Sequence, residues 1–130
     1  IIDKRRPQPN VAEVMKILGD VDGKDVIIVD DIIDTAGTVT VAAKALKEAG
    51  ARQIFVCCSH PVLSDPATIR IMASEIKEIV TTNSICLPLY KRTTKITQLS
   101  IAKILGQGIL NIIDGKGVSD LFNYNPNQRF

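Results

Sequence analysis

Residues 26–38 of this 130-residue chain read VIIVDDIIDTAGT. Four β-branched apolar residues at 26–29 run without a polar interruption into Asp30 and Asp31, a pattern that predicts a strand buried on both faces of a parallel sheet. A short loop of small and hydroxylated residues follows at 34–38. The next residues have apolar side chains at helical spacing, namely Val39, Ala42, Ala43 and Leu46. We therefore expect a strand with Asp30 and Asp31 at its carboxyl end, a loop at 34–38, and a helix.

The alternation of strand and helix patterns continues along the chain. Gly50 marks the end of the first helix, and residues 52–59 (RQIFVCCS) predict a second strand. Asp65 and Pro66 suit the N-cap and first position of a second helix, with an apolar stripe at Ile69, Met72, Ala73 and Ile76. Further strands are expected at 78–82 and 95–99. Strand, helix and strand in succession predict an α/β fold with a mostly parallel central sheet and a right-handed crossover.

Two further segments show helical periodicity. A last helix is expected after Ser100 as its cap, with an apolar face formed by Ile101, Ile104, Leu105, Gly108 and Ile112. Residues 11–18 also suit a helix by periodicity, because alternation through residues 14–18 is poor. The last eight residues, 123–130 (NYNPNQRF), are polar and are expected to form a tail.

Composition limits the classes of function. Apolar residues make up 45% of the chain and charged residues 23%, as in a soluble globular domain. The net charge of +2 gives no reason to expect binding to nucleic acid or a membrane surface, and no apolar run approaches the roughly 20 residues of a membrane span. Three cysteines, an odd number without disulfide spacing, favour a reduced, cytoplasmic compartment. The abrupt start at Ile1 suggests a piece of a longer protein without a visible signal peptide.

The aspartates and the loop together indicate a phosphorylated sugar as the ligand. Ionised carboxylates at 30 and 31 only accept hydrogen bonds, so a vicinal diol such as the ribose 2′,3′ pair suits them. The backbone N–H groups of residues 34–38, the hydroxyls of Thr35 and Thr38 and the start of a helix suit a phosphate. Gly37 is expected to take a positive φ and to let the backbone approach the anion. A solvated turn with an N-cap is the simpler alternative, but it requires neither three aspartates nor two threonines.

Two other features carry weaker signals. Lys4, Arg5 and Arg6, followed by Pro7 and Pro9, form a cationic, non-helical segment that is either a solvated linker or a mobile loop that binds phosphoryl oxygens. His60 is the only histidine; a structural role or a place in a pocket wall is favoured over a base or metal ligand. No set of residues has zinc-ligand spacing, and no Walker A lysine or GxGxxG motif is present.

VIIVDDIIDTAGT resembles the phosphoribosyl-diphosphate (PRPP) loop that type I phosphoribosyltransferases share with the ribose-phosphate diphosphokinases, or PRPP synthetases. The synthetase family is favoured because further segments are similar to it, from residue 1 to about 122. They are IIDKRRP at 1–7, NVAEVMKILGDVDGKDV at 10–26, CCSHPVLS at 57–64, TTNSI at 81–85 and GVSDLF at 117–122. The resemblance implies a three-layer, type I phosphoribosyltransferase-like fold and the C-terminal domain of a synthetase whose N-terminal half is absent here. It also implies a strand at residues 13–18.

The resemblance implies transfer of the diphosphoryl group of ATP to O1 of ribose 5-phosphate, giving PRPP and AMP. By matching position, Lys4 and Arg6 correspond to catalytic residues of the family's flexible loop. The ribose-5-phosphate site corresponds to Asp30, Asp31, Asp34, Thr35, Ala36, Gly37 and Thr38. Mg²⁺ is expected to be held mainly through substrate oxygens. The family also implies a homo-oligomer built from dimers, hexamers included, and an isolated fragment without activity.

The sequence departs from the family's pattern at three positions. Asp65 stands where the family commonly has Gly, and Gly117 and Asp120 alter a stretch that contributes to the family's regulatory site. The departures at 117 and 120 bear on regulation and leave the catalytic assignment unchanged, whereas Asp65 replaces the glycine with a helix-capping residue. A type I phosphoribosyltransferase would use the same loop but gives no reason for IIDKRRP or GVSDLF. A non-catalytic, synthetase-associated regulatory homologue is the other alternative, and retention of Lys4, Arg6 and the whole loop argues against it.

Overall fold

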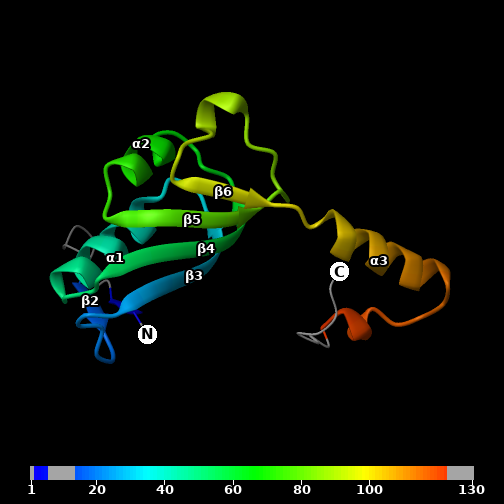
Figure 1. Ribbon diagram of the computed structural model, residues 1–130, viewed down its shortest axis with the longest axis horizontal. Coiled ribbons are helices and arrows are strands. Elements are labelled where there is room, and N and C mark those ends of the chain that lie inside the picture. Colours follow the sequence, from blue (N-terminus) through cyan, green and yellow to red (C-terminus); the bar gives the residue numbers. More distant parts are fainter. Residues whose placement is uncertain (1, 6–13, 123–130) are drawn as a thin grey trace. The chain divides into compact units, whose positions relative to one another are not determined.

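The computed structural model describes residues 2–5 and 14–122, and its strands confirm the expected α/β organisation. A four-stranded sheet has the order β3-β4-β5-β6, with β3 at Asp25–Ile33, β4 at Gln53–Pro61, β5 at Ile76–Thr82 and β6 at Ile96–Leu99 (Figure 1). The β3/β4 and β4/β5 pairs are parallel. Two short strands, β1 at Ile2–Arg5 and β2 at Val14–Ile17, pair antiparallel. The family-based expectation of a strand, rather than a helix, after residue 13 is thus confirmed.

Three α-helices and two short 3₁₀ helices connect or follow these strands. They are α1 at Gly37–Glu48, α2 at Ala67–Met72 and α3 at Ala102–Ile113, with η1 at Leu89–Lys91 and η2 at Ser119–Phe122. No helix in the described ranges is both long and apolar enough to span a bilayer. The chain divides into two compact units, residues 1–98 and 99–130. The assignment of residues 1–122 to one functional domain, with a tail at 123–130, stays a prediction.

The core of the first unit lies between the sheet and the first two helices. The expected stripe of α1 is confirmed, because all four of its residues are at most 4% exposed. Val39, Ala43 and Leu46 of this stripe belong to one cluster of buried side chains. The cluster also contains Ile54 and Val56 of β4 and Ala67 and Ile71 of α2. Burial of such side chains contributes about 1.5–3 kcal/mol each for the larger ones. Packing against β4 therefore fixes where α1 begins, directly after the loop at 34–36.

Strand β3 is not buried on both faces as its apolar run predicted. Burial alternates along it, so that Ile27 is 62% and Val29 79% exposed while Val26 and Ile28 are half-buried. β3 stands at the end of the strand order, and successive side chains point to opposite faces. An unbroken apolar run gives two-sided burial only where layers cover both faces, and the core cluster of this unit draws on one of them.

The predicted helix caps are only partly correct. Gly50 does end α1: it follows the C-cap Ala49 and has φ +91°. Asp65 is not the N-cap of α2, since Pro66 takes that position without any side-chain capping hydrogen bond. Pro66, predicted as the first helical residue, therefore lies one position before the observed first residue, Ala67. The N-cap of α3 is Ile101 rather than Ser100, although the Ser100 hydroxyl accepts a hydrogen bond from the Ala102 N–H at 3.3 Å.

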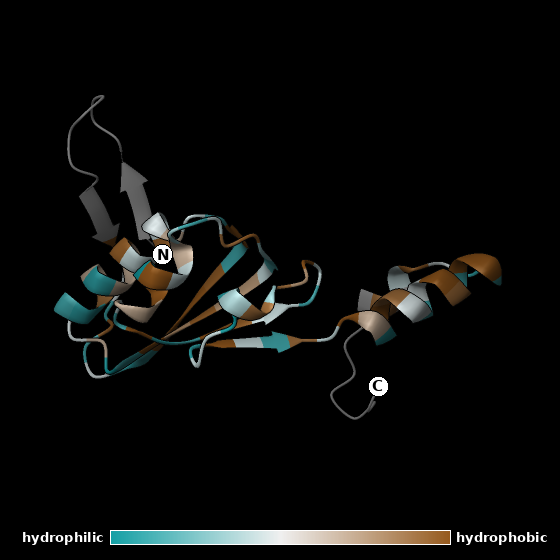
Figure 2. Cartoon of the chain, turned by 90° about the horizontal axis from the view of Figure 1, so that it is seen from above, coloured by the Kyte–Doolittle hydropathy of each residue, from teal (hydrophilic) through white to brown (hydrophobic). Residues whose placement is uncertain are grey.

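The predicted apolar face of α2 is wrong, and the predicted face of the last helix lies on a confirmed helix, α3, but is largely exposed. In α2 the buried residues are Ala67 and Ile71, whereas Ile69 is 71% exposed. The helix ends at Met72, and Ile76 already begins β5, so the assumed stripe spanned two elements. In α3 the apolar side chains are exposed over most of the helix, whose ribbon is largely coloured hydrophobic in Figure 2, and Asn111 is its buried residue. The Asn111 side chain donates to the Gly117 carbonyl oxygen at 3.2 Å, which holds the turn after α3.

Candidate functional site

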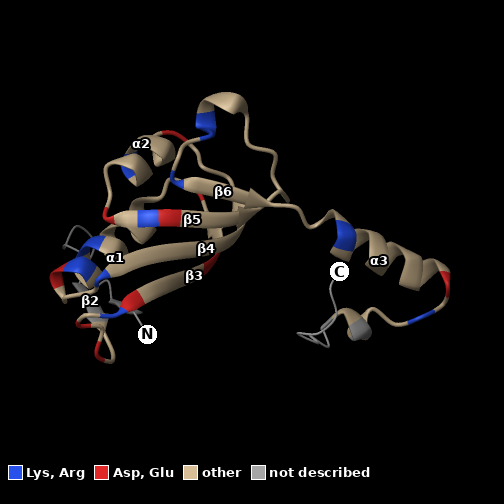
Figure 3. Cartoon of the chain, in the orientation of Figure 1, with Lys and Arg blue, Asp and Glu red and all other residues tan. Residues whose placement is uncertain are grey.

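The candidate site lies where β3 ends and α1 begins. Pairing with β4 continues to the end of β3, with Asp30 opposite Cys58 and Ile32 opposite His60. The strand ends at Ile33, and the prediction that Asp30 and Asp31 lie at its carboxyl end is confirmed. Both aspartates are strand residues near the carboxyl end of the sheet, which is the edge where ligands of open α/β sheets collect. Figure 3 colours the acidic residues of β3 red.

The strand places its two neighbouring carboxylates differently. Asp30 is half-buried and Asp31 is exposed, and neighbours in a strand point to opposite faces. Each carboxylate accepts a hydrogen bond from the following backbone N–H, Asp30 from Asp31 at 2.9 Å and Asp31 from Ile32 at 2.8 Å. These bonds fix the orientation of each carboxylate while leaving further lone pairs for a ligand.

The loop after β3 contains a left-handed residue, but not the predicted one. Ala36 has φ 59° and ψ 10°, whereas Gly37 is the first residue of α1 and has no positive φ. Ala36 is 4% exposed and acts as the N-cap without a side-chain hydrogen bond. The prediction of a positive φ at Gly37 is wrong because the reversal of the chain is completed one residue earlier, so that the glycine can enter the helix. An L-residue adopts this conformation at a cost of about 1–2 kcal/mol.

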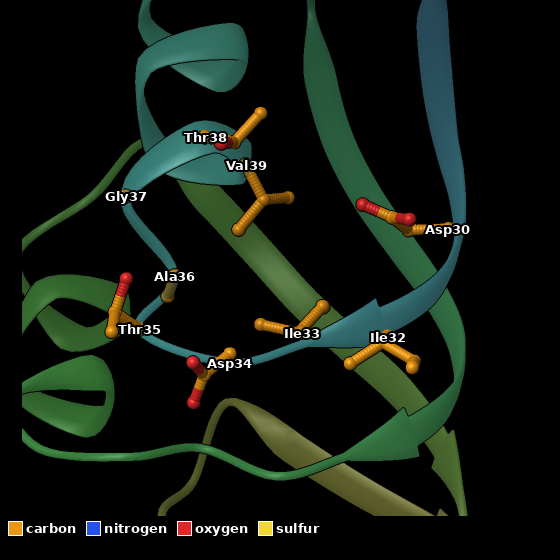
Figure 4. Close-up of a pocket in the computed structure, with 9 residues that line it drawn as sticks. All are labelled: Asp30, Ile32, Ile33, Asp34, Thr35, Ala36, Gly37, Thr38 and Val39. Atoms are coloured by element: carbon orange, nitrogen blue, oxygen red, sulfur yellow. The ribbon is translucent and has the colours of Figure 1, made fainter.

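A cavity of about 220 Å³ brings most of the predicted residues together. Figure 4 shows the side chains that line it, which come from β3, the loop and the first turn of α1. The lining consists of Asp30, Ile32, Ile33, Asp34, Thr35, Ala36, Gly37, Thr38 and Val39. All predicted ribose-5-phosphate residues are thus in the lining except Asp31.

The local electrostatics favour an anion at the loop. α1 has no acidic residue in its first turn and no side chain caps its start. A helix start carries roughly half a positive charge and presents backbone N–H groups to a ligand. The carboxylates of Asp30 and Asp34 line the same cavity, and they suit hydroxyl donors rather than anions. The cavity therefore combines acceptors for hydroxyls with donors for an anion.

Cys58 and His60 lie on β4, beside Asp30 and Ile32 of β3. The pKa of the Cys58 thiol is raised to about 11. Burial is the larger cause, and the negative charge of Asp30 on the paired strand is the next. The His60 Nδ1 lies 2.9 Å from the Ser84 hydroxyl oxygen, and that hydroxyl lies 2.8 Å from the Ser59 carbonyl oxygen that it donates to. Because the one hydroxyl hydrogen is used on Ser59, His60 is the donor to Ser84. His60 thus has the structural contact that the sequence favoured.

Sequence reasoning missed one residue of the site. Arg70 of α2 donates from Nη1 to the Thr35 carbonyl oxygen at 3.0 Å, across 35 positions of the chain. No motif around Arg70 signals this contact. Only its place on a helix that joins the same core cluster as α1 brings its side chain to the loop.

The predicted catalytic residues are described only in part. The backbone of Lys4 belongs to β1, where it pairs with Met15, so this part of the basic segment is a strand and, as predicted, not a helix. Arg6 lies outside the described residues. Within the described ranges, no three His, Cys, Asp or Glu side chains gather as a metal-ligand set. A magnesium ion bound through one or two carboxylates and substrate phosphate oxygens requires no such set.

Comparison with known proteins relates the whole arrangement to one family. Residues 3–123 match the family model described as phosphoribosyl synthetase-associated domain. The chain is 61% identical over 122 residues to ribose-phosphate pyrophosphokinase 1 of Listeria monocytogenes, covering 94% of this chain and 38% of that protein. It is 56% identical over 123 residues to the ribose-phosphate pyrophosphokinase of Bacillus cereus, covering 95% of this chain and 39% of that protein.

A solved structure agrees with these sequence matches. The phosphoribosylpyrophosphate synthetase of Mycobacterium smegmatis superposes with a TM-score of 0.77 at 37% identity, over 78% of this chain and 34% of that one. The chain thus spans somewhat more than a third of the length of the curated relatives it matches.

Proposed function

Since the chain belongs to the phosphoribosyl synthetase-associated domain family, we propose that it supplies the ribose-5-phosphate site of a ribose-phosphate diphosphokinase. In the proposed reaction, O1 of ribose 5-phosphate attacks the β-phosphorus of ATP. The bond from this phosphorus to the oxygen shared with the α-phosphate breaks, the O1 proton is lost, and PRPP and AMP are released. One observation carries the assignment to this site. The Asp30 carboxylate and the loop at 34–38 line a single cavity at the start of α1.

The proposed roles follow from the chemistry of the groups. The loop holds the 5-phosphate through backbone N–H groups and the hydroxyls of Thr35 and Thr38. Asp30 accepts hydrogen bonds from the ribose hydroxyls, and the resemblance assigns Asp31 to the same diol. Since phosphate and diol are bound at separate points, the sugar cannot rotate, and O1 keeps a fixed position for attack. Lys4 and Arg6 are proposed to stabilise charge on the transferring phosphoryl oxygens.

The cofactor and partners are part of the same proposal. Mg²⁺ would neutralise phosphate charge and would be held mainly through substrate oxygens. ATP and ribose 5-phosphate are the proposed substrates, and a homo-oligomer in the cytoplasm is the proposed state. The non-catalytic regulatory homologue remains the alternative of a different class.

The experiment that separates enzyme from regulator uses the full-length protein. We expect Lys4→Ala or Arg6→Ala to lower kcat by at least about a hundredfold with a smaller change in KM, because contacts made chiefly in the transition state affect turnover. Arg5→Ala is the matched control, since it removes the same charge from the same segment, and it should change kcat little. PRPP and AMP formation would be measured together. Equal, negligible effects of Lys4→Ala and Arg5→Ala would contradict the catalytic assignment and favour the regulator.

A further inference from the structure

The contact between Arg70 and the loop has a consequence for the orientation of one peptide group. The Thr35 carbonyl oxygen accepts the hydrogen bond from Arg70 Nη1 at 3.0 Å. The Thr35–Ala36 peptide is trans, and in a planar trans peptide the C=O and N–H bonds point in opposite directions. The Ala36 N–H therefore points away from Arg70, and Ala36 lines the cavity (Figure 4). Arg70 thus fixes the direction of a donor at the proposed phosphate position.

The same peptide group has an alternative orientation that would relieve the backbone. Ala36 has φ 59°, a region that L-residues adopt rarely. Rotation of the Thr35–Ala36 peptide plane by half a turn would move the φ of Ala36 to about −120°, which is an allowed value. That rotation would exchange the N–H for a carbonyl oxygen, which repels a phosphate. The observed orientation keeps the N–H on the side away from Arg70, and it is not the one that an alanine prefers.

We propose that Arg70 is a positioning residue that holds the Thr35–Ala36 peptide with its N–H toward the anion. The inference rests on the proposed function only for the identity of the anion, the 5-phosphate of the sugar. The side chain of Arg70 is exposed and forms no ion pair with an acidic residue in the described part of the chain. Its charge therefore remains available to strengthen its hydrogen bond to the carbonyl oxygen.

Arg70 also explains why the loop tolerates alanine at position 36. Glycine would adopt the positive φ without cost, but it would also leave the loop free to rotate. With alanine at position 36, the Thr35–Ala36 peptide keeps one orientation, because the hydrogen bond from Arg70 to the Thr35 carbonyl oxygen offsets the backbone strain at Ala36. A Cβ added at Gly37 would lie 3.7 Å from Arg70 Nη1, an ordinary contact, so the guanidinium is directly beside the first turn of α1.

The test compares four forms of the full-length protein: wild type, Arg70→Ala, Arg52→Ala and the double variant Arg70→Ala/Ala36→Gly. Ribose 5-phosphate and inorganic phosphate are titrated calorimetrically into each. We expect Arg70→Ala to weaken both ligands about tenfold or more, as for loss of a charge-assisted hydrogen bond. Arg52→Ala removes the same charge but lies beside Asp25 at the opposite end of β3, and it should leave both affinities unchanged. Ala36→Gly should restore most of the loss, because glycine adopts the positive φ freely.

The restoration distinguishes peptide positioning from direct contact. If Arg70 bound the phosphate itself, Ala36→Gly would not compensate for its removal, so a double variant as weak as Arg70→Ala would overturn the inference. Wild-type affinity in Arg70→Ala would overturn it as well. A crystal structure of Arg70→Ala gives a readout independent of the ligand, and we expect the Thr35 carbonyl oxygen to point into the cavity. Should the wild type not bind ribose 5-phosphate, the proposed function fails, while the peptide orientation in this crystal still decides the role of Arg70.

Discussion

Asparagine at position 30 should separate recognition of the sugar from recognition of its phosphate. Asn keeps the Oδ1 that accepts the Asp31 N–H at 2.9 Å, so the side chain should retain its orientation. It loses the negative charge that strengthens hydrogen bonds from ribose hydroxyls. Loss of one such charge-assisted bond costs about 1.5–3 kcal/mol, which corresponds to a roughly ten- to more than hundredfold weaker affinity. Inorganic phosphate, bound at the loop, should keep its affinity.

Calorimetric titration of the full-length protein with both ligands gives the two affinities directly. Asp25→Asn is the matched control, because it removes a carboxylate from the same strand at its other end, where Asp25 pairs with Arg52. It should leave both affinities unchanged. Equal losses for ribose 5-phosphate and phosphate in Asp30→Asn would refute the reasoning, since the diol and the phosphate would then not be held by separate groups.

The same variant should also alter a second, independent property of the site. The charge of Asp30 contributes to the raised pKa of Cys58, after burial, which is the larger cause. Asp30→Asn should therefore lower the pKa of Cys58 only in part and leave it above the ordinary thiol value. The pH dependence of thiol alkylation, measured in a variant whose other two cysteines are replaced by serine, would show this shift. An unchanged pKa would mean that the Asp30 carboxylate does not lie beside Cys58.

Two further predictions concern stability. Gly50→Ala should destabilise the protein by at least about 2 kcal/mol in urea unfolding, because φ +91° disfavours any Cβ and the added atom would collide with the Asp22 side chain. Gly23→Ala, also at positive φ but in open space, is the control and should cost about 1 kcal/mol. Equal losses in the two variants would contradict the collision. The pKa of Cys58 is about 11 in the folded protein, above the unfolded value of 9.0. The protonated thiol therefore contributes its full share to the free energy of unfolding below pH 9, and this share is lost as pH rises from 9 to 11. Relative to Cys58→Ala, the wild type should therefore lose up to about 2 kcal/mol of unfolding free energy over that range, and parallel pH profiles of the two would contradict the shift.

The sequence predicted the elements of the fold better than their surroundings. The stripe of α1 was predictable because its apolar residues face one core at helical spacing. The exposure of Ile27 and Val29 was not, since an apolar run contains no information on how many layers cover a strand. The α2 stripe failed for a related reason: Ile76 continued the helical spacing of Ile69 and Met72 but belongs to the next strand. Periodicity identifies a face but not the residue at which an element ends.

The candidate site was predictable as a set of residues but not as a geometry. The string of aspartates, threonines and glycine identified the loop at 34–38, whose members line one cavity. The continuation of β3 to Ile33 depends on pairing with β4, which no local pattern reports. That continuation separates Asp30, in the cavity lining, from Asp31. It also moves the chain reversal to Ala36, so that the glycine is used for the first helical turn instead.

The position of the left-handed residue connects these observations to function. If Gly37 adopted the positive φ, the loop would hold its conformation without a hydrogen bond from another element, because glycine reverses the chain at little cost. With the reversal at Ala36, the loop requires support from outside its own sequence, and Arg70 of α2 provides the hydrogen bond at the adjacent carbonyl. α2 is held in place by Ala67 and Ile71, both fully buried in the cluster that also anchors α1. The proposed anion-binding geometry of the loop therefore depends on the folded unit, and a peptide containing only the motif should bind phosphate far more weakly.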